Sequence, residues 1–209
     1  SPCNCLFLKP QLEHFEKIIS SIQKNVRDLN AFIDLNVPYL ETQNQEPGFE
    51  HVYHFCRYKC NGKNLELSNT GLLRECIMDI MQAEGLPLRL YQTHPVYGQL
   101  IFRRIKECKK NDVYPWALNV KNLQLYRENY SYERHKNTLN AIDYSFAIGN
   151  NGPSASIFLN KKLIDLYKEG FFKITSNINE LVEYYYKKTK YESPYDGNVR
   201  LSDTNGDFV

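Results

Sequence analysis

One apolar repeat near the N-terminus constrains the fold of this chain more than any other feature. Seven large apolar residues follow one another at alternating steps of three and four: Leu12, Phe15, Ile19, Ile22, Val26, Leu29 and Ile33. This spacing places them on one side of a helix, so it predicts a long amphipathic helix from about Pro10 to Asn36. A coiled-coil seam has the same steps, but the repeat lasts only about three heptads, which favours a face packed in a bundle.

The remainder of the first 92 residues is also predicted to be mainly helical. Pro38 ends the first helix, because the proline ring cannot continue the hydrogen-bond ladder. The aromatic-rich stretch Phe49–Cys60 is ambiguous between strand and helix. A second helix is expected from about Asn69 to Glu84, where Gly85 stops it. The apolar side of this second helix is formed by Leu73, Ile77, Ile80 and Met81.

From about His94 the pattern changes to one helix, several short strands and a last helix. A helix is expected at Tyr97–Lys109, and the final helix begins at Asn177, with Glu180 three positions later as in an N-cap. Strands are expected at Ala117–Tyr126, Tyr144–Ile148, Ser156–Leu159 and Phe171–Thr175. The buried face of the last helix is expected to consist of Ile178, Leu181, Val182 and Tyr185. We therefore predict two domains, residues 1–92 and residues 93–205.

Composition excludes several classes of protein. Hydrophobic residues make up 42% and aromatic residues 13%, which argues against a disordered chain. The formal charge of +2 creates no basic field that would attract nucleic acid. No apolar run approaches the roughly 20 residues that span a bilayer, and no secretory pattern is visible at the N-terminus. A cytoplasmic protein with six reduced cysteines and no membrane insertion is the expectation.

Six segments in the second half occur in the order found in one known family. Leu123–Asn129 is similar to a central-strand signature, Phe-Leu-Val-Arg-Glu-Ser, and Gly170–Ser176 is similar to a turn and strand, Gly-Phe-Tyr-Ile-Thr. The other four segments are His94–Leu100, Asp143–Ile148, Asn179–Tyr185 and Asp196–Leu201. Together they resemble an SH2 domain. The resemblance implies an α+β fold with a central antiparallel sheet flanked by two helices, preceded here by the mainly helical N-terminal region.

The resemblance also implies a phosphotyrosine site centred on Arg127. An arginine suits a phosphate dianion, because its planar fork donates two parallel charge-assisted hydrogen bonds. Carried over from the family, the other phosphotyrosine-binding positions are Arg103, Arg104, Asn129, Ser131, Arg134 and Lys162, the last on a strand beside the tyrosine ring. Two positions depart from the pattern, since Val96 replaces the usual tryptophan and Asn129 the usual serine.

The preferred hypothesis is a non-catalytic signalling adaptor that binds tyrosine-phosphorylated proteins. The alternative is a degenerate SH2-like scaffold that binds proteins without phosphotyrosine. The residue bias towards Lys, Asn, Ile and Tyr is typical of an AT-rich genome, which leaves open a microbial effector that acts on tyrosine signalling in a host cytosol.

Catalysis, a metal and a cofactor are not expected. No cysteine or serine lies in a recognisable nucleophile turn, and no glycine-rich phosphate loop occurs. His51, His54, Cys56 and Cys60 lie close together in the sequence, and Cys3 and Cys5 are available to join them, but the regular ligand spacings of zinc sites are missing.

Overall fold

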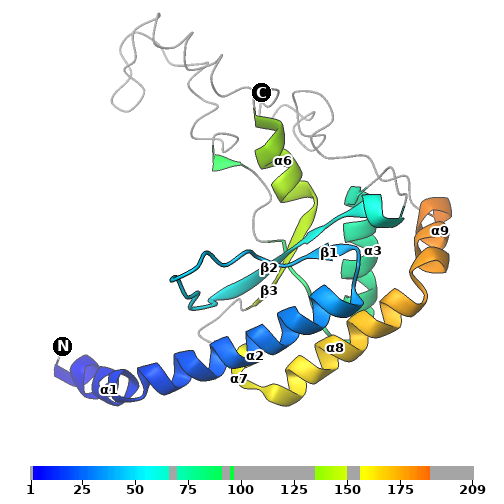
Figure 1. Cartoon of the computed structure of the whole chain (residues 1–209). Coiled ribbons are helices and arrows are strands. Elements are labelled where there is room, and N and C mark those ends of the chain that lie inside the picture. Colours follow the sequence, from blue (N-terminus) through cyan, green and yellow to red (C-terminus); the bar gives the residue numbers. More distant parts are fainter. Residues whose placement is uncertain (1, 66–69, 91–94, 97–134, 150–155, 189–209) are drawn as a thin grey trace, which may run out of the picture. The chain divides into compact units, whose positions relative to one another are not determined.

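The computed structural model describes residues 2–65, 70–90, 95–96, 135–149 and 156–188 (Figure 1). The chain divides into two compact units, one formed by residues 1–89 and 145–189 and the other by residues 90–144 and 190–209. The described helix of the second unit is α6 (Lys136–Asp143). The first unit contains α1 (Pro2–Glu13), α2 (Phe15–Asn36), β1 (Leu40–Glu41), β2 (Phe55–Cys60), the short 3-10 helix η1 (Gly62–Leu65), α3 (Thr70–Ala83), β3 (Ser145–Gly149), α7 (Ser156–Leu159), α8 (Lys161–Ser176) and α9 (Ile178–Lys188).

The sheet of the first unit joins distant parts of the chain. It is antiparallel, with the strand order β1-β2-β3, and β2 pairs with β3 from Phe55 opposite Gly149 to Lys59 opposite Ser145. Gly149 is required at its position, because its φ is 151° and a Cβ there would lie 2.6 Å from the Cβ of Phe55. An α+β architecture was predicted, and the mixture of helices with an antiparallel sheet confirms that coarse class. The unit crosses the boundary expected between residues 92 and 93, because β1 and β2 precede it and β3 follows it.

Three aromatic rings form the centre of the core between the sheet and the helices. The ring centroid of Tyr58 on β2 lies 5.9 Å from that of Phe146 on β3 and 6.4 Å from that of Phe171 on α8. The rings of Phe146 and Phe171 are stacked, with centroids 6.3 Å apart. The hydroxyl of Tyr58 donates a 2.9 Å hydrogen bond to Oδ1 of Asn30 on α2. One face of the sheet is therefore covered by α2 and α8, which run side by side (Figure 1).

Both helices predicted in the first part of the chain are present. Ile22, Val26, Leu29 and Ile33 of the repeat are buried, which confirms a packed face over this stretch. The predicted helix is interrupted at His14 and extends further, to Pro2, than the repeat indicated. The second predicted helix is α3, and its end is the one expected at Gly85, where φ is 77° and the next amide, of Leu86, donates to the carbonyl of Met81.

In the second part of the chain some elements agree with the prediction and others do not. The strand predicted at Tyr144–Ile148 is β3, and the last predicted helix is α9, with Ile178 and Val182 buried. Residues 136–143, for which no helix or strand was predicted, form α6. The elements expected at residues 97–109 and 117–126 lie outside the described residues.

Two predicted strands are wrong, because Ser156–Leu159 is α7 and Phe171–Thr175 lies within α8. The buried side of α8 consists of Ile164, Tyr167, Phe171 and Ile174, again at steps of three and four. Asn160 starts this helix, since its side chain accepts a 3.2 Å hydrogen bond from the Leu163 amide. Gly170 belongs to no turn. A Cβ at Gly170 would lie 3.0 Å from both Met81 and Leu86, so glycine permits close packing inside the helix.

A candidate binding groove between helices α2 and α8

Most of the predicted phosphotyrosine site cannot be placed. Arg103, Arg104, Arg127, Asn129, Ser131 and Arg134 lie outside the described residues. Lys162 is exposed in the first turn of α8, so its predicted place on a strand is wrong. The reason is the Asn160 cap, which begins a helix at the point where a strand was expected.

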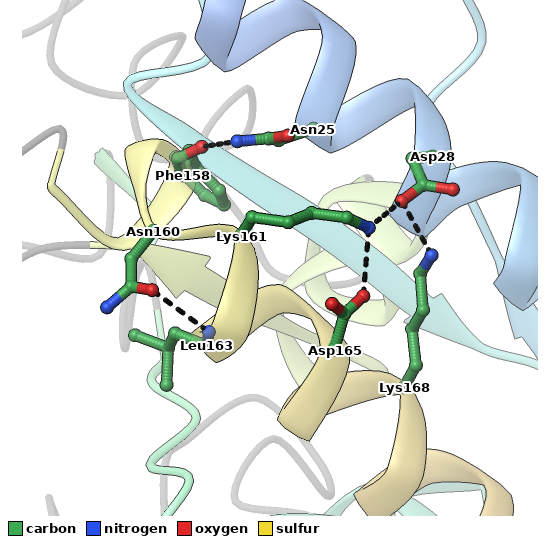
Figure 2. Close-up of polar contacts among 8 residues, drawn as sticks. All are labelled: Asn25, Asp28, Phe158, Asn160, Lys161, Leu163, Asp165 and Lys168. Atoms are coloured by element: carbon green, nitrogen blue, oxygen red, sulfur yellow. Dashed lines mark hydrogen bonds and ion pairs between the residues drawn. The ribbon is translucent and has the colours of Figure 1, made fainter.

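A polar network fastens the first turns of α8 to the middle of α2 (Figure 2). The carboxylate of Asp28 on α2 accepts hydrogen bonds from Lys161 and Lys168, and the Lys168 nitrogen lies 2.7 Å from it. Lys161 also donates to Asp165 on its own helix, at 2.8 Å. The Asn25 side chain on α2 donates a 2.7 Å hydrogen bond to the carbonyl of Phe158, which lies on α7 just before α8. The network fixes the register between α2 and α8.

The network shifts the proton affinities of its members. The hydrogen bond from Lys161, and then that from Lys168, lower the pKa of Asp28 below its ordinary 3.8. The hydrogen bonds to Asp165 and Asp28 raise the pKa of Lys161. Both groups are therefore charged across the physiological range, and the network remains intact there.

One turn further along, the same two helices form an apolar groove of about 340 Å³. It is lined by Phe32 of α2 and by Lys168, Glu169, Phe172 and Lys173 of α8. Phe172 is 57% exposed, although Phe171 beside it is buried. The Lys168 nitrogen lies 5.9 Å from the centroid of the Phe32 ring while it is held by Asp28, so its alkyl stem forms part of the wall. This groove is the candidate binding site.

The groove was missed because its wall on α8 was interpreted as strand and loop. Lys161, Asp165, Lys168 and Phe172 follow one another at steps of four, three and four, which puts them on one side of a helix. That spacing was the available signal. It points to a surface only once α8 is recognised as a helix, and the contribution of Phe32 follows only from the packing of α2 on α8.

Cysteine chemistry is suppressed in the core. Cys56, Cys60 and Cys76 are buried, and burial raises the pKa of the Cys56 and Cys76 thiols to about 12 and that of Cys60 above its usual range. Such thiols remain protonated at neutral pH, and a protonated thiol is a poor nucleophile. Among the described residues, no three His, Cys, Asp or Glu side chains are grouped so that they could hold a metal ion.

Replacing Asp28 by Asn is expected to lower the free energy of unfolding by about 0.5–1 kcal/mol at pH 7, because the pair is partly exposed. A lowered folded-state pKa gives stability that is present above the unfolded pKa of about 3.8 and lost as pH falls through the folded value. Denaturant titrations at several pH values should therefore show that the free energies of unfolding of wild type and Asp28→Asn become equal as the pH falls below about 4.

Asp165→Asn is the matched control for this experiment. Asp165 bonds Lys161 within α8 alone, so its loss is expected to have a smaller effect than the loss of Asp28, which joins two helices. If the difference in free energy of unfolding between wild type and Asp28→Asn stayed constant from pH 7 to pH 3, the ionised Asp28 carboxylate would not be the group that stabilises the contact between α2 and α8.

Comparison with known proteins identifies no family. Neither the models of known protein families nor the curated protein sequences contain a match to this chain. Within the described residues, no helix combines the length and the apolar character needed to cross a bilayer.

Proposed function

We propose that this chain is a non-catalytic module that binds another protein by receiving an amphipathic helix in the groove between α2 and α8. The observation that carries the proposal is the groove itself, in which the exposed ring of Phe172 lines an apolar hollow whose Lys168 wall is held in place by Asp28. An exposed aromatic side chain beside a preformed hollow is typical of interaction sites.

The size of the groove suits one or two side chains of a partner protein. About 340 Å³ lies at the lower end of the range of ligand pockets, roughly 300–1,000 Å³. A Leu or Phe side chain of a partner helix that is buried there gains about 1.5–3 kcal/mol from the hydrophobic effect. One or two such anchors at helical spacing are the usual basis of helix-in-groove recognition.

The charges around the groove indicate what flanks the apolar anchor. Lys168 is paired with Asp28, and Lys173 is paired with Glu84 at 2.7 Å, so both lysines are neutralised within the chain. Glu169 is exposed; its carboxylate acts on the charge of Lys173 one turn later but lies within 4 Å of no cationic group among the described residues. The partner helix we propose therefore carries a Lys or Arg next to its apolar anchor, positioned to meet Glu169.

Recognition of phosphotyrosine is a second and more specific proposal for how this chain binds proteins, and it depends on Arg127. The helical structure of α8 removes one of the six segments on which the SH2 resemblance depends, Gly170–Ser176. The general proposal of protein binding at the groove does not depend on Arg127. The two proposals are therefore tested by different substitutions.

Peptides selected from a library can test the groove whatever the natural partner is. A displayed library of amphipathic helical peptides, with randomised apolar and basic positions, is selected against the full chain. Phe172→Ala is expected to weaken the selected peptides about ten-fold or more, which equals about 1.4 kcal/mol. Glu169→Gln is expected to weaken those with a basic flanking residue. Calorimetric titration measures both effects.

The matched control is Leu166→Ala. Leu166 is a large apolar residue on the same helix, 49% exposed, that does not line the groove. Peptides that bind Leu166→Ala as well as wild type but lose affinity for Phe172→Ala support the site. Equal losses, or no loss with Phe172→Ala, refute it. A phosphotyrosine peptide pool titrated against wild type and Arg127→Ala tests the phosphotyrosine proposal separately.

A further inference from the structure

The apolar repeat of the first two helices continues beyond the part that the core covers. It begins at Leu8, one step before Leu12, and runs to Ile33 in strict steps of four and three. Its second half, from Ile22 onward, is buried, whereas Leu8, Leu12 and Phe15 are 51%, 62% and 53% exposed. The part of this repeat before Ile19, which crosses the interruption at His14, is therefore exposed in the described part of the chain.

The exposed part of the seam formed by this repeat lies on a projecting arm. We use the name arm for residues 6–19, which belong to α1 and the first turns of α2. Figure 1 shows α1 extending beyond the sheet at the end of the unit marked N. The helix is nearly continuous through His14, since the His14 amide donates to the carbonyl of Pro10 and the Ile18 amide to that of His14. Pro10 lies inside α1, and the helix is interrupted at His14. Across this interruption the arm presents the exposed Leu8, Leu12 and Phe15, with the half-buried Ile19 as the next residue of the repeat.

The charges beside this seam are arranged for a second copy of the same arm. Lys9 directly follows Leu8 and Glu16 directly follows Phe15, so both occupy the same position relative to the seam. In an antiparallel pair of arms this position faces its own equivalent, and Lys9 of each chain meets Glu16 of the other. In a parallel pair, Glu16 would instead meet Gln11, and no opposite charges would face each other.

We propose that two copies of the chain associate through antiparallel pairing of their arms. A two-fold axis crosses the seam between Leu12 and Phe15. Leu12 then packs on Phe15 of the other chain, Leu8 packs on Ile19, and two equivalent pairs of Lys9 with Glu16 flank these layers. The contact is isologous, as in most homodimers, and therefore closes on itself without forming a fibre.

This association goes beyond the proposed function, because the arm and the groove share no residue. The competing ion pair within one chain is weak, since Lys9 and Glu13 are 3.9 Å apart and both are exposed. The apolar contact is only about four layers long. We therefore expect a dimer whose population rises with protein concentration across the micromolar range.

Sedimentation equilibrium of the full chain over a range of concentrations tests the pairing. Wild type is expected to shift from monomer to dimer, and Leu12→Asp to remain monomeric with an unchanged melting temperature, because Leu12 contributes nothing to the core. Leu6→Asp is the matched control, since Leu6 is an exposed apolar residue of the same helix that lies off the seam. A wild type that stays monomeric, or a Leu6→Asp variant as disruptive as Leu12→Asp, overturns the proposal.

Charge reversal tests the antiparallel arrangement specifically. Lys9→Glu and Glu16→Lys are each expected to weaken the homodimer about ten-fold, because symmetry turns two attractive pairs into two repulsive ones. An equimolar mixture of the two variants should restore dimers of one copy of each, since opposite charges meet again. Failure of the mixture to form mixed dimers overturns the antiparallel arrangement.

Discussion

Phe171→Ala is expected to lower the free energy of unfolding of this protein by about 3–5 kcal/mol. The ring of Phe171 is fully buried and contacts both Tyr58 and Phe146 at the centre of the core. Its removal leaves a cavity between α8 and the sheet that the paired strands β2 and β3 cannot close. Chemical denaturation followed by circular dichroism measures the loss, and a marginally stable chain is expected to unfold outright.

Two further substitutions make this prediction specific for a helical α8. Phe172→Ala, at the next and exposed position, is expected to change stability by less than about 0.5 kcal/mol. A helix places Phe171 and Ile174 on the same side, whereas a strand places them on opposite faces. Ile174→Ala is therefore expected to be severe as well. A mild effect at Ile174 together with a severe one at Lys173→Ala would indicate the strand that the sequence resemblance suggested.

The elements that could be predicted are those whose signals are local. The repeat through Ile22 and Ile33 predicted the packed face of α2, because apolar spacing follows directly from helix geometry. Gly85 predicted the end of α3, since the left-handed φ of that position favours glycine. Strand β3 and helix α9 were likewise recognised from short patterns of apolar residues.

Helix α8 was mispredicted because the local signals were given too little weight against a family pattern. Gly170 followed by two phenylalanines imitates a turn and a strand. In the structure, the absence of a side chain at Gly170 lets α8 pack closely against Met81 and Leu86. This tertiary contact is not visible in any local sequence pattern. The steps from Ile164 to Ile174 and the cap at Asn160 were the opposing signals.

The candidate groove could not have been predicted from single segments. Phe32 and Phe172 are 140 positions apart in the sequence, and they line one hollow only because α2 packs on α8. The pairing of β2 with β3 is equally non-local, since Tyr58 faces Phe146 across the expected domain boundary. Patterns that repeat within one element carry no information about such contacts.

Separating the chain at the expected boundary is predicted to unfold the elements that lie across it. In a fragment of residues 93–209, β3 lacks its partner β2, and α8 lacks α2 and α3. The rings of Phe146 and Phe171 then lose Tyr58, and the backbone groups of β3 that bond β2 lose their partners. The ordering entropy of these elements is then no longer offset by burial against residues 1–92.

The most direct measurement is the nuclear magnetic resonance spectrum of isotope-labelled residues 93–209, recorded alone and with unlabelled residues 1–92. Resonances of β3 and α8 are predicted to be poorly dispersed in the isolated fragment and to become dispersed when the N-terminal fragment is added, as the two halves rebuild one core. Dispersed β3 and α8 resonances in the isolated fragment, unchanged by the N-terminal fragment, would show that the second part folds alone and would contradict the shared core.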